Sequence, residues 1–263
     1  MRWRIAILVL WSLGCDAPAA APRYAPLVCD DAAADHVAFG VQMADAHFAP
    51  TGQRHYGEHF LFVDGSCRWF AGRTDVDPLA LVGAVRTGTL DASLLAELNA
   101  SLLTGPWERL DADYRAWGGP DGGADAPTHS LWRDERGVRC YSGCADWADY
   151  RPMQNAALDW ERRLAELGVP FEGPVRLVWS HTSSTLARAH DWTGATDLAS
   201  ALTESYGELL VTDEGDAATL RAWRAEAVRG EAIAMRVAER HFTAYVIDAI
   251  PIADDAGRVR PPF

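Results

Sequence analysis

The sequence contains no lysine, because all 24 of its basic residues are arginine. Without lysine, the phosphate-binding loop Gly-x-x-x-x-Gly-Lys cannot occur, and no Gly-x-Gly-x-x-Gly stretch follows a predicted strand. The Gly-x-Ser-x-Gly motif of serine hydrolases is absent as well. These absences exclude the common nucleotide-binding loops, and the sequence gives no reason to expect a cofactor.

Positive charge is scarce relative to negative charge. The 24 basic residues stand against 37 acidic ones, a formal net charge of −13. Loss of Arg2 and Arg4 with a signal peptide would leave 22 basic residues against 37 acidic ones, a formal charge of −15. A surface this acidic repels phosphate backbones. We therefore expect no nucleic-acid partner and no polybasic membrane patch.

Long hydrophobic runs are also missing. The apolar run at residues 5–13 is nine residues long, and no later stretch approaches the 18 needed for a membrane-spanning helix. Arg2 and Arg4 precede this run, and a positive start followed by a short apolar run is typical of a secretory signal peptide. We therefore expect export, with any membrane attachment made through lipid.

Two processing routes are open at the end of this run. Residues 13–15, Leu-Gly-Cys, resemble the lipobox of bacterial lipoproteins, although Ser12 stands where that family usually has leucine. The resemblance implies a lipid anchor on Cys15, an Ala/Pro-rich tether at residues 16–28, and a place in the cell envelope facing the periplasm or the exterior. Residues 17–19, Ala-Pro-Ala, offer the alternative of ordinary signal-peptidase cleavage. The cysteine directly after the apolar run favours the lipobox.

Four cysteines remain in the body of the chain. An even number in an oxidising compartment favours two disulfides, with three possible pairings. A zinc site would need a second close-spaced pair of ligands beside Cys140 and Cys144, and the sequence has none. We predict a Cys29–Cys67 bond and a Cys140–Cys144 bond, although spacing alone does not determine the pairing.

Alternating hydrophobic residues predict a strand and two hairpins. In residues 37–43 the larger apolar side chains recur at every second position, as on one face of a strand. Asp64-Gly65 suits a tight turn between two apolar stretches, and residues 134–137 separate two others. The predicted hairpins join residues 60–63 to 67–70 and residues 130–133 to 138–141.

Helical spacing of leucines predicts a helix that follows these first three strands. Thr89 or Asp91 can cap it, Gly105-Pro106 ends it, and its helical spacing is that of Leu94, Leu95, Leu98 and Leu102. Further helices are predicted at residues 152–167, near 197–205 and near 216–229, and further strands at 175–179 and 242–250. Residues 232–237 either pair with the last strand as a hairpin or extend the preceding helix.

This order of elements predicts an α+β fold with a largely antiparallel sheet built from β-hairpins with interposed helices. Residues 29–150 form the first unit. Residues 151–263 are either a second α+β half or continuous with the first, since no clear linker marks the boundary.

One stretch matches a catalytic motif. Residues 55–59 read His-Tyr-Gly-Glu-His, the His-x-x-Glu-His pattern of inverted zinc peptidases, in which His55 and His59 would bind metal and Glu58 would act as base. Gly57 and the strand expected from Phe60 leave no helix to hold both imidazoles. The sequence therefore favours a polar loop, with an exported metal-dependent hydrolase as an alternative.

Three other groups of residues are candidate sites. Ser180, His181, Ser183 and Ser184 are neighbours only in sequence, and we expect a solvated turn there. The acidic residues Asp111, Asp113, Asp121 and Asp125 lack the regular spacing of a calcium loop. Trp117, Trp147 and Trp192 could form an exposed platform for sugars. The sequence favours a non-catalytic binding or structural role, with a protein or glycan partner undefined and a glycan-binding module as a further alternative.

Overall fold

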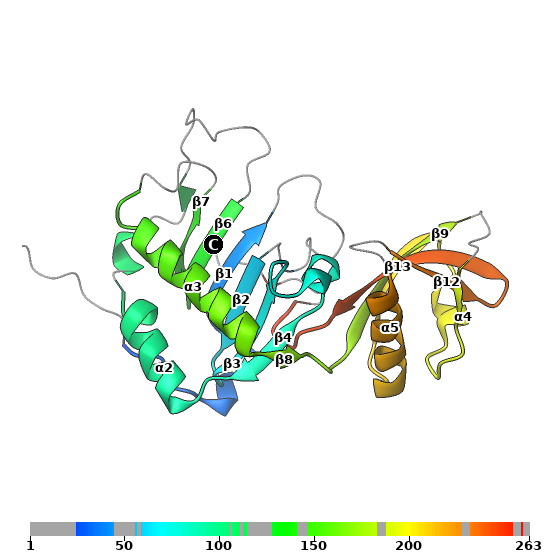
Figure 1. The fold of residues 1–263 in the computed structure, drawn as a ribbon, viewed down its shortest axis with the longest axis horizontal. Coiled ribbons are helices and arrows are strands. Elements are labelled where there is room, and N and C mark those ends of the chain that lie inside the picture. The colour runs from blue at the N-terminus through cyan, green and yellow to red at the C-terminus, as the bar shows by residue number, and fades with distance from the viewer. Residues whose placement is uncertain are drawn as a thin grey trace, which may run out of the picture.

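The protein folds into two sheets that lie side by side with helices packed on them (Figure 1). The computed structural model describes residues 25–44, 56, 59–105, 107–110, 113–114, 128–140, 147–182, 188–227, 232–254 and 259. Most neighbouring strands are antiparallel, and short hairpins join β2 to β3, β6 to β7 and β12 to β13, so the predicted α+β fold is confirmed. The signal region and Cys15 lie outside the described residues.

The first sheet, sheet A, has eight strands in the order β5-β7-β6-β1-β2-β3-β4-β8. All of its pairings are antiparallel except the short parallel pairing of β5 with β7. Its strands are β1 (Val37–Ala44), β2 (His59–Asp64), β3 (Arg68–Arg73), β4 (Arg86–Thr89), β5 (Asp113–Tyr114), β6 (Thr128–Arg133), β7 (Arg136–Cys140) and β8 (Val169–Pro170).

Both predicted hairpins of sheet A are confirmed. The first turn differs in detail, because the left-handed residue is Cys67, with φ of 65°, whereas Asp64-Gly65 was expected to take that conformation. The second turn is shorter than expected, since β7 already begins at Arg136. Strand β4 was not predicted, because Arg-Thr-Gly-Thr carries no hydrophobic alternation.

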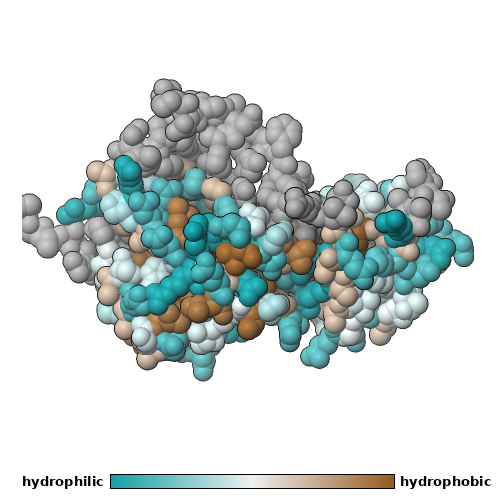
Figure 2. All heavy atoms as spheres, in the orientation of Figure 1, coloured by the Kyte–Doolittle hydropathy of each residue, from teal (hydrophilic) through white to brown (hydrophobic). Residues whose placement is uncertain are grey.

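Two helices pack on one face of sheet A. Helix α2 (Ala92–Leu98), capped by the Asp91 side chain, continues into a π-helical turn (Asn99–Leu103). Helix α3 (Arg151–Leu167) crosses the strands (Figure 1). It buries an apolar stripe made of Met153, Ala157, Trp160 and Leu164, whereas Leu167 at its end is 59% exposed. Hydrophobic residues stand in small groups among hydrophilic ones on the face of the molecule that α3 crosses (Figure 2). The core between α3 and the sheet is built around Phe39, Val41, Leu61, Val63, Trp69, Leu131, Ala157, Trp160 and Leu164.

The second sheet, sheet B, has five strands in the order β10-β12-β13-β9-β11. The predicted final hairpin is confirmed as β12 with β13. Helix α4 ends at Ala201, before the expected end near residue 205, and β11 follows from Tyr206. The elements are β9 (Val175–Thr182), β10 (His190–Asp191), α4 (Leu198–Ala201), β11 (Tyr206–Val211), α5 (Glu214–Glu226), β12 (Ile233–Val237) and β13 (Arg240–Asp248). Short 3-10 turns lie at Asp31–Ala33, Pro78–Val82 and Trp107–Arg109.

The chain passes from sheet A to sheet B between Pro170 and Val175. Helix α3 and strand β8 therefore belong with sheet A, although both follow residue 150, near which the sequence placed the division. Among the helices that the structure describes, none combines the length and the apolar character needed to cross a bilayer.

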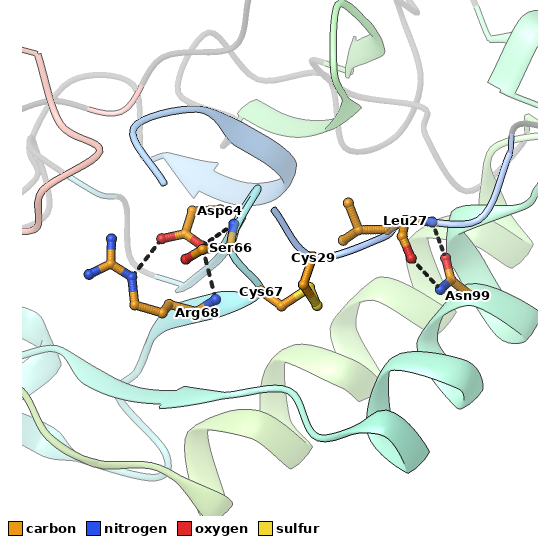
Figure 3. Close-up of a disulfide and its surroundings, with 7 residues drawn as sticks. All are labelled: Leu27, Cys29, Asp64, Ser66, Cys67, Arg68 and Asn99. Atoms are coloured by element: carbon orange, nitrogen blue, oxygen red, sulfur yellow. Dashed lines mark hydrogen bonds and ion pairs between the residues drawn. A yellow bond between two sulfur atoms is a disulfide. The ribbon is translucent and has the colours of Figure 1, made fainter. Parts of the chain in front are cut away.

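A disulfide secures the start of the described chain (Figure 3). The predicted Cys29–Cys67 bond is present, and it links the N-terminal segment to the β2–β3 turn. Next to it, the backbone N–H of Leu27 donates to Asn99 Oδ1 at 2.7 Å, and Asn99 Nδ2 donates to the carbonyl of Leu27 at 3.0 Å. The last residues of the stretch assigned to the tether are thus held against the π-helical turn.

Replacing both cysteines of this bond, Cys29→Ala with Cys67→Ala, is expected to lower the free energy of unfolding by about 2–4 kcal/mol. The bond spans 38 residues, and without it the unfolded chain regains the conformational entropy of that loop. Urea titration followed by circular dichroism measures the change. A loss below about 1 kcal/mol would show that the bond does not restrict the unfolded chain in this way.

The two sheets are joined by buried contacts to Asp248, at the end of β13. Arg221 Nε donates to Asp248 Oδ1 at 2.7 Å, and Arg224 Nη2 donates to Oδ2 at 3.1 Å. The backbone N–H of Val85, just before β4, donates to the same Oδ2 at 2.8 Å. Tyr56 donates its hydroxyl to the Asp248 carbonyl at 2.6 Å, and burial raises the pKa of Tyr56. We call these five residues the Asp248 cluster, because one carboxylate ties α5 to sheet A.

Candidate functional site

A row of four side chains crosses the end of sheet A beneath α3. Met43 on β1 lies directly opposite His59 on β2 and His129 on β6, and His59 lies opposite Arg73 on β3. Directly opposed residues on neighbouring strands point to the same face. His129, Met43, His59 and Arg73, which we call the histidine row, therefore all point to the α3 side of the sheet.

Helix α3 supplies the other side of a pocket of about 570 Å³. Asn155, Leu158, Asp159 and Arg162 recur at helical spacing and line it opposite the histidine row. Small-molecule sites commonly have volumes of about 300–1,000 Å³. This cavity, the α3 pocket, is therefore large enough for a metabolite-sized ligand and is built on regular secondary structure.

A buried carboxylate lies beside the pocket. The Glu161 side chain on α3 is 1% exposed, and its Oε1 accepts from Arg73 Nη1 at 3.2 Å. His59 Nδ1 lies 3.8 Å from the same oxygen. The second oxygen, Oε2, is buried without a hydrogen-bond partner among the residues described. Glu161 is not one of the residues that line the pocket, so it acts on a ligand only through His59 and Arg73.

Burial outweighs the attraction of Arg73 and raises the pKa of Glu161 to about 8. Arg73 compensates Glu161 only in part, because it also donates twice to Asp75, from Nε at 2.8 Å and from Nη2 at 3.1 Å. Those hydrogen bonds lower the pKa of Asp75. Glu161 is therefore mostly protonated at neutral pH, while Asp75 carries the negative charge that neutralises Arg73.

His129 at the far end of the row is held neutral. Burial, with a smaller contribution from the charge of His59, lowers the pKa of His129. Its Nδ1 lies 3.1 Å from Nε2 of Gln154, which is on the first turns of α3. The pocket therefore places two imidazoles, a protonated carboxylic acid and two guanidinium groups within one small region, and clusters of perturbed titratable groups are typical of functional sites.

Of the His-x-x-Glu-His motif, only Tyr56 and His59 are described. Tyr56 has helical backbone geometry and is 1% exposed, so the expected polar loop does not hold at that residue. His59 opens strand β2 and belongs to the histidine row. His55 and Glu58 lie outside the described residues. In the part of the chain that the structure describes, no three His, Cys, Asp or Glu side chains are grouped closely enough to hold a metal ion.

The serine and histidine residues near position 181 do not form the expected turn. Ser180 and His181 lie within β9, which continues to Thr182, because both pair with β11 or β13. The His181 ring packs edge-on against Phe242, with 5.5 Å between centroids. Ser183 and Ser184 lie outside the described residues.

The tryptophans proposed as a sugar platform are packed against other aromatic rings. Trp147 stacks on Tyr150 at 5.7 Å, and Trp192 meets Trp223 edge-on at 5.8 Å. Both are partly buried, and Trp192 Nε1 donates to the carbonyl of Thr196. These two residues are therefore poor candidates for a flat exposed platform, while Trp117 lies outside the described residues.

The remaining predicted sites are described only in part. Asp113 lies in β5 opposite Arg139, while Asp111, Asp121 and Asp125 lie outside the described residues. Cys140 is disulfide-bonded, as predicted, and its predicted partner Cys144 also lies outside them.

Glu161, Arg73 and His129 were not predicted as site residues from the sequence. A signal for Glu161 was present, because it lies four residues after Ala157 and three before Leu164 and so falls on the apolar face of α3. A charged residue on a buried face is unusual unless it is paired. His59 and His129 also stand two residues before the inward-facing Leu61 and Leu131, which places them on the core side of their strands.

Comparison with known proteins gives no relative: no family model, no curated protein and no solved structure matches the chain.

Proposed function

We propose that the chain is an exported, lipid-anchored cell-envelope protein with a non-catalytic binding role, and that the α3 pocket is its ligand site. The pocket is the observation that carries the binding role. It combines polar groups from β2, β3, β6 and α3 with the apolar side chains of Met43 and Leu158. Such a mixture on a rigid sheet suits the recognition of a small polar molecule.

Export is supported by the N-terminal residues and by the cysteines. A positively charged start, a short apolar run and Cys15 follow one another as in bacterial lipoproteins. The Cys29–Cys67 bond fits the same view, since structural disulfides persist mainly in oxidising compartments. About ten residues separate Cys15 from Ala25, and an extended chain of that length reaches roughly 35 Å. The anchored body would therefore stay near the membrane surface.

The anchor is tested by the intact mass of the protein purified from the membranes of a bacterial host. A chain that begins at Cys15 and carries added lipid mass is expected, because the lipobox cysteine becomes the modified N-terminus. In a Cys15→Ser variant, the lipid mass should be lost and the protein should leave the membrane fraction. The Cys29–Cys67 bond should be retained in that variant, which serves as the folding control. A lipid-free wild-type chain that begins after Ala19 would overturn the anchor.

An exported hydrolase is the second candidate, because His59 of the motif lies in the α3 pocket beside Glu161. In this reading His59 is the residue that contacts the substrate or a metal. Metal analysis of the purified protein separates the candidates: stoichiometric zinc that is lost in a His59→Ala variant would support the hydrolase. Zinc retained by a variant with both His55→Ala and His59→Ala would exclude this site.

A further inference from the structure

We propose that the α3 pocket binds a small ligand through an oxyanion group such as a carboxylate, sulfate or phosphate, with His59, His129 and Arg162 as its donors. This inference rests on the proposed binding role and names the ligand class for the same pocket.

The lining of the pocket favours an anion. Nitrogen-bearing side chains outnumber acidic ones, since His59, His129, Arg73 and Arg162 line it together with one carboxylate, that of Asp159. Arg73 is fixed by its hydrogen bonds to Asp75 and Glu161 and is 10% exposed. It therefore supplies a stationary guanidinium group, much of whose charge is neutralised by Asp75.

Arg162 is the mobile donor of the pocket. Its side chain is 59% exposed, and its Nη2 lies 3.3 Å from Asp75 Oδ2, an oxygen that already accepts from Arg73. A partly exposed ion pair of this kind is weak. Arg162 can therefore turn from Asp75 to a ligand at small cost, and an arginine can donate two parallel hydrogen bonds to an oxyanion.

Glu161 lies behind His59 and can transfer a proton to it when a ligand binds. An anion beside the imidazole of His59 favours the imidazolium form. If the Glu161 O–H bond breaks and an N–H bond forms at Nδ1 of His59, the number of protons in the protein is unchanged. The result is a positive ring beside the ligand and a negative carboxylate behind it. His59 Nδ1 and Glu161 Oε1 are 3.8 Å apart, so a small shift of the ring brings them into contact.

The charged and titratable groups around His59 and Glu161 come from β3 and the turn after it, from β6 and from α3. Arg73 and Asp75 belong to β3 and the turn after it, and His129 belongs to β6. Asp159 and Arg162 are on α3. Asp159 opposes an anion and would attract a cation, so replacing it distinguishes the two ligand classes by the sign of the effect.

The test is isothermal titration of the purified, oxidised protein with sodium sulfate, since sulfate keeps its charge over the pH range used. We expect one site, with affinity about three- to tenfold higher at pH 6.0 than at pH 8.5, because the Glu161–His59 pair gains a proton as pH falls through the raised pKa of Glu161. Arg162→Gln should weaken binding about three- to tenfold through loss of a charge-assisted hydrogen bond. Asp159→Asn should strengthen it by about twofold or more, because a like charge is removed.

Arg163→Gln is the matched control and should leave sulfate binding unchanged, because Arg163 pairs with Glu97 of α2 and does not line the pocket. Absence of sulfate binding up to tens of millimolar, or weaker binding in Asp159→Asn, would overturn the anion assignment. Binding of tetramethylammonium at this site, lost in Asp159→Asn, would also overturn it while leaving the binding role intact. None of these outcomes affects the proposed lipid anchor, which is tested separately by the intact mass of the mature protein.

Discussion

Asp248→Ala is expected to lower the free energy of unfolding by about 3–5 kcal/mol, as is typical when one partner of a buried ion pair is removed. The Asp248 side chain is 1% exposed, while those of Arg221 and Arg224 are 16% and 7% exposed. Removing the carboxylate leaves the buried guanidinium of Arg224 and the partly buried one of Arg221 without their counter-charge, and the Val85 N–H without its acceptor. Because this carboxylate joins α5 to sheet A, the loss should also weaken the junction between the sheets.

Chemical denaturation followed by tryptophan fluorescence measures this change. Asp191→Ala is the matched control, because Asp191 also pairs with an arginine, Arg236, but both side chains are largely exposed. Its effect should be much smaller. Asp248→Asn keeps the size of the side chain and part of its hydrogen bonding. Its loss of unfolding free energy should therefore fall between those of Asp248→Ala and Asp191→Ala. Equal losses of unfolding free energy in Asp248→Ala and Asp191→Ala would contradict the role of Asp248 in joining the two sheets.

Glu161→Gln is expected to remove a pH dependence of stability that the wild-type protein shows between about pH 4.5 and 8. In the folded protein the pKa of Glu161 is raised from 4.5 to about 8. Between these values the folded state binds more protons at this site than the unfolded state, so wild-type stability falls as pH rises. Above about pH 8 the loss is complete, and its size is about 2–5 kcal/mol. Glutamine cannot ionise, so the variant should be more stable than the wild type at pH 8.5.

The difference in unfolding free energy between variant and wild type, measured at several pH values, isolates this group from the other carboxylates. Glu97→Gln is the control, because Glu97 is exposed and its hydrogen bond to Arg163 lowers its pKa. Glu97 therefore stays ionised above pH 5, and its replacement should give a constant difference from there to pH 9. A constant difference for Glu161→Gln would mean that Glu161 is ionised in the folded protein throughout this range.

Local patterns predicted the elements whose own residues specify them. The alternation in residues 37–43, the turn residues of the two hairpins and the apolar stripe of α3 each reflect contacts within a few residues along the chain. Two of the strands that were missed, β4 and β11, lack that alternation and are strands because their neighbours β3 and β9 supply backbone partners. Pairing with a neighbour is a tertiary effect, so no local pattern reports it.

In the candidate site, too, a local pattern predicted one residue, whereas tertiary contacts decided its partners. The His-x-x-Glu-His pattern drew attention to His59, but its partners in the pocket are far away in the sequence. His129 is brought to it by the pairing of β1 with both β2 and β6, and Glu161 by the packing of α3 on that sheet. Which strands become neighbours, and which helix face they bury, depends on the whole core.

The amino-acid sequence by itself determined the α+β class, the two hairpins of sheet A and the long helix, because period, turn chemistry and the order of elements are local properties. The tertiary structure alone decided that Met43 stands between two histidines, that Glu161 is buried beside Arg73, and that Asp248 joins the two sheets. Burial and strand order create those neighbours, and neither is a property of any single segment.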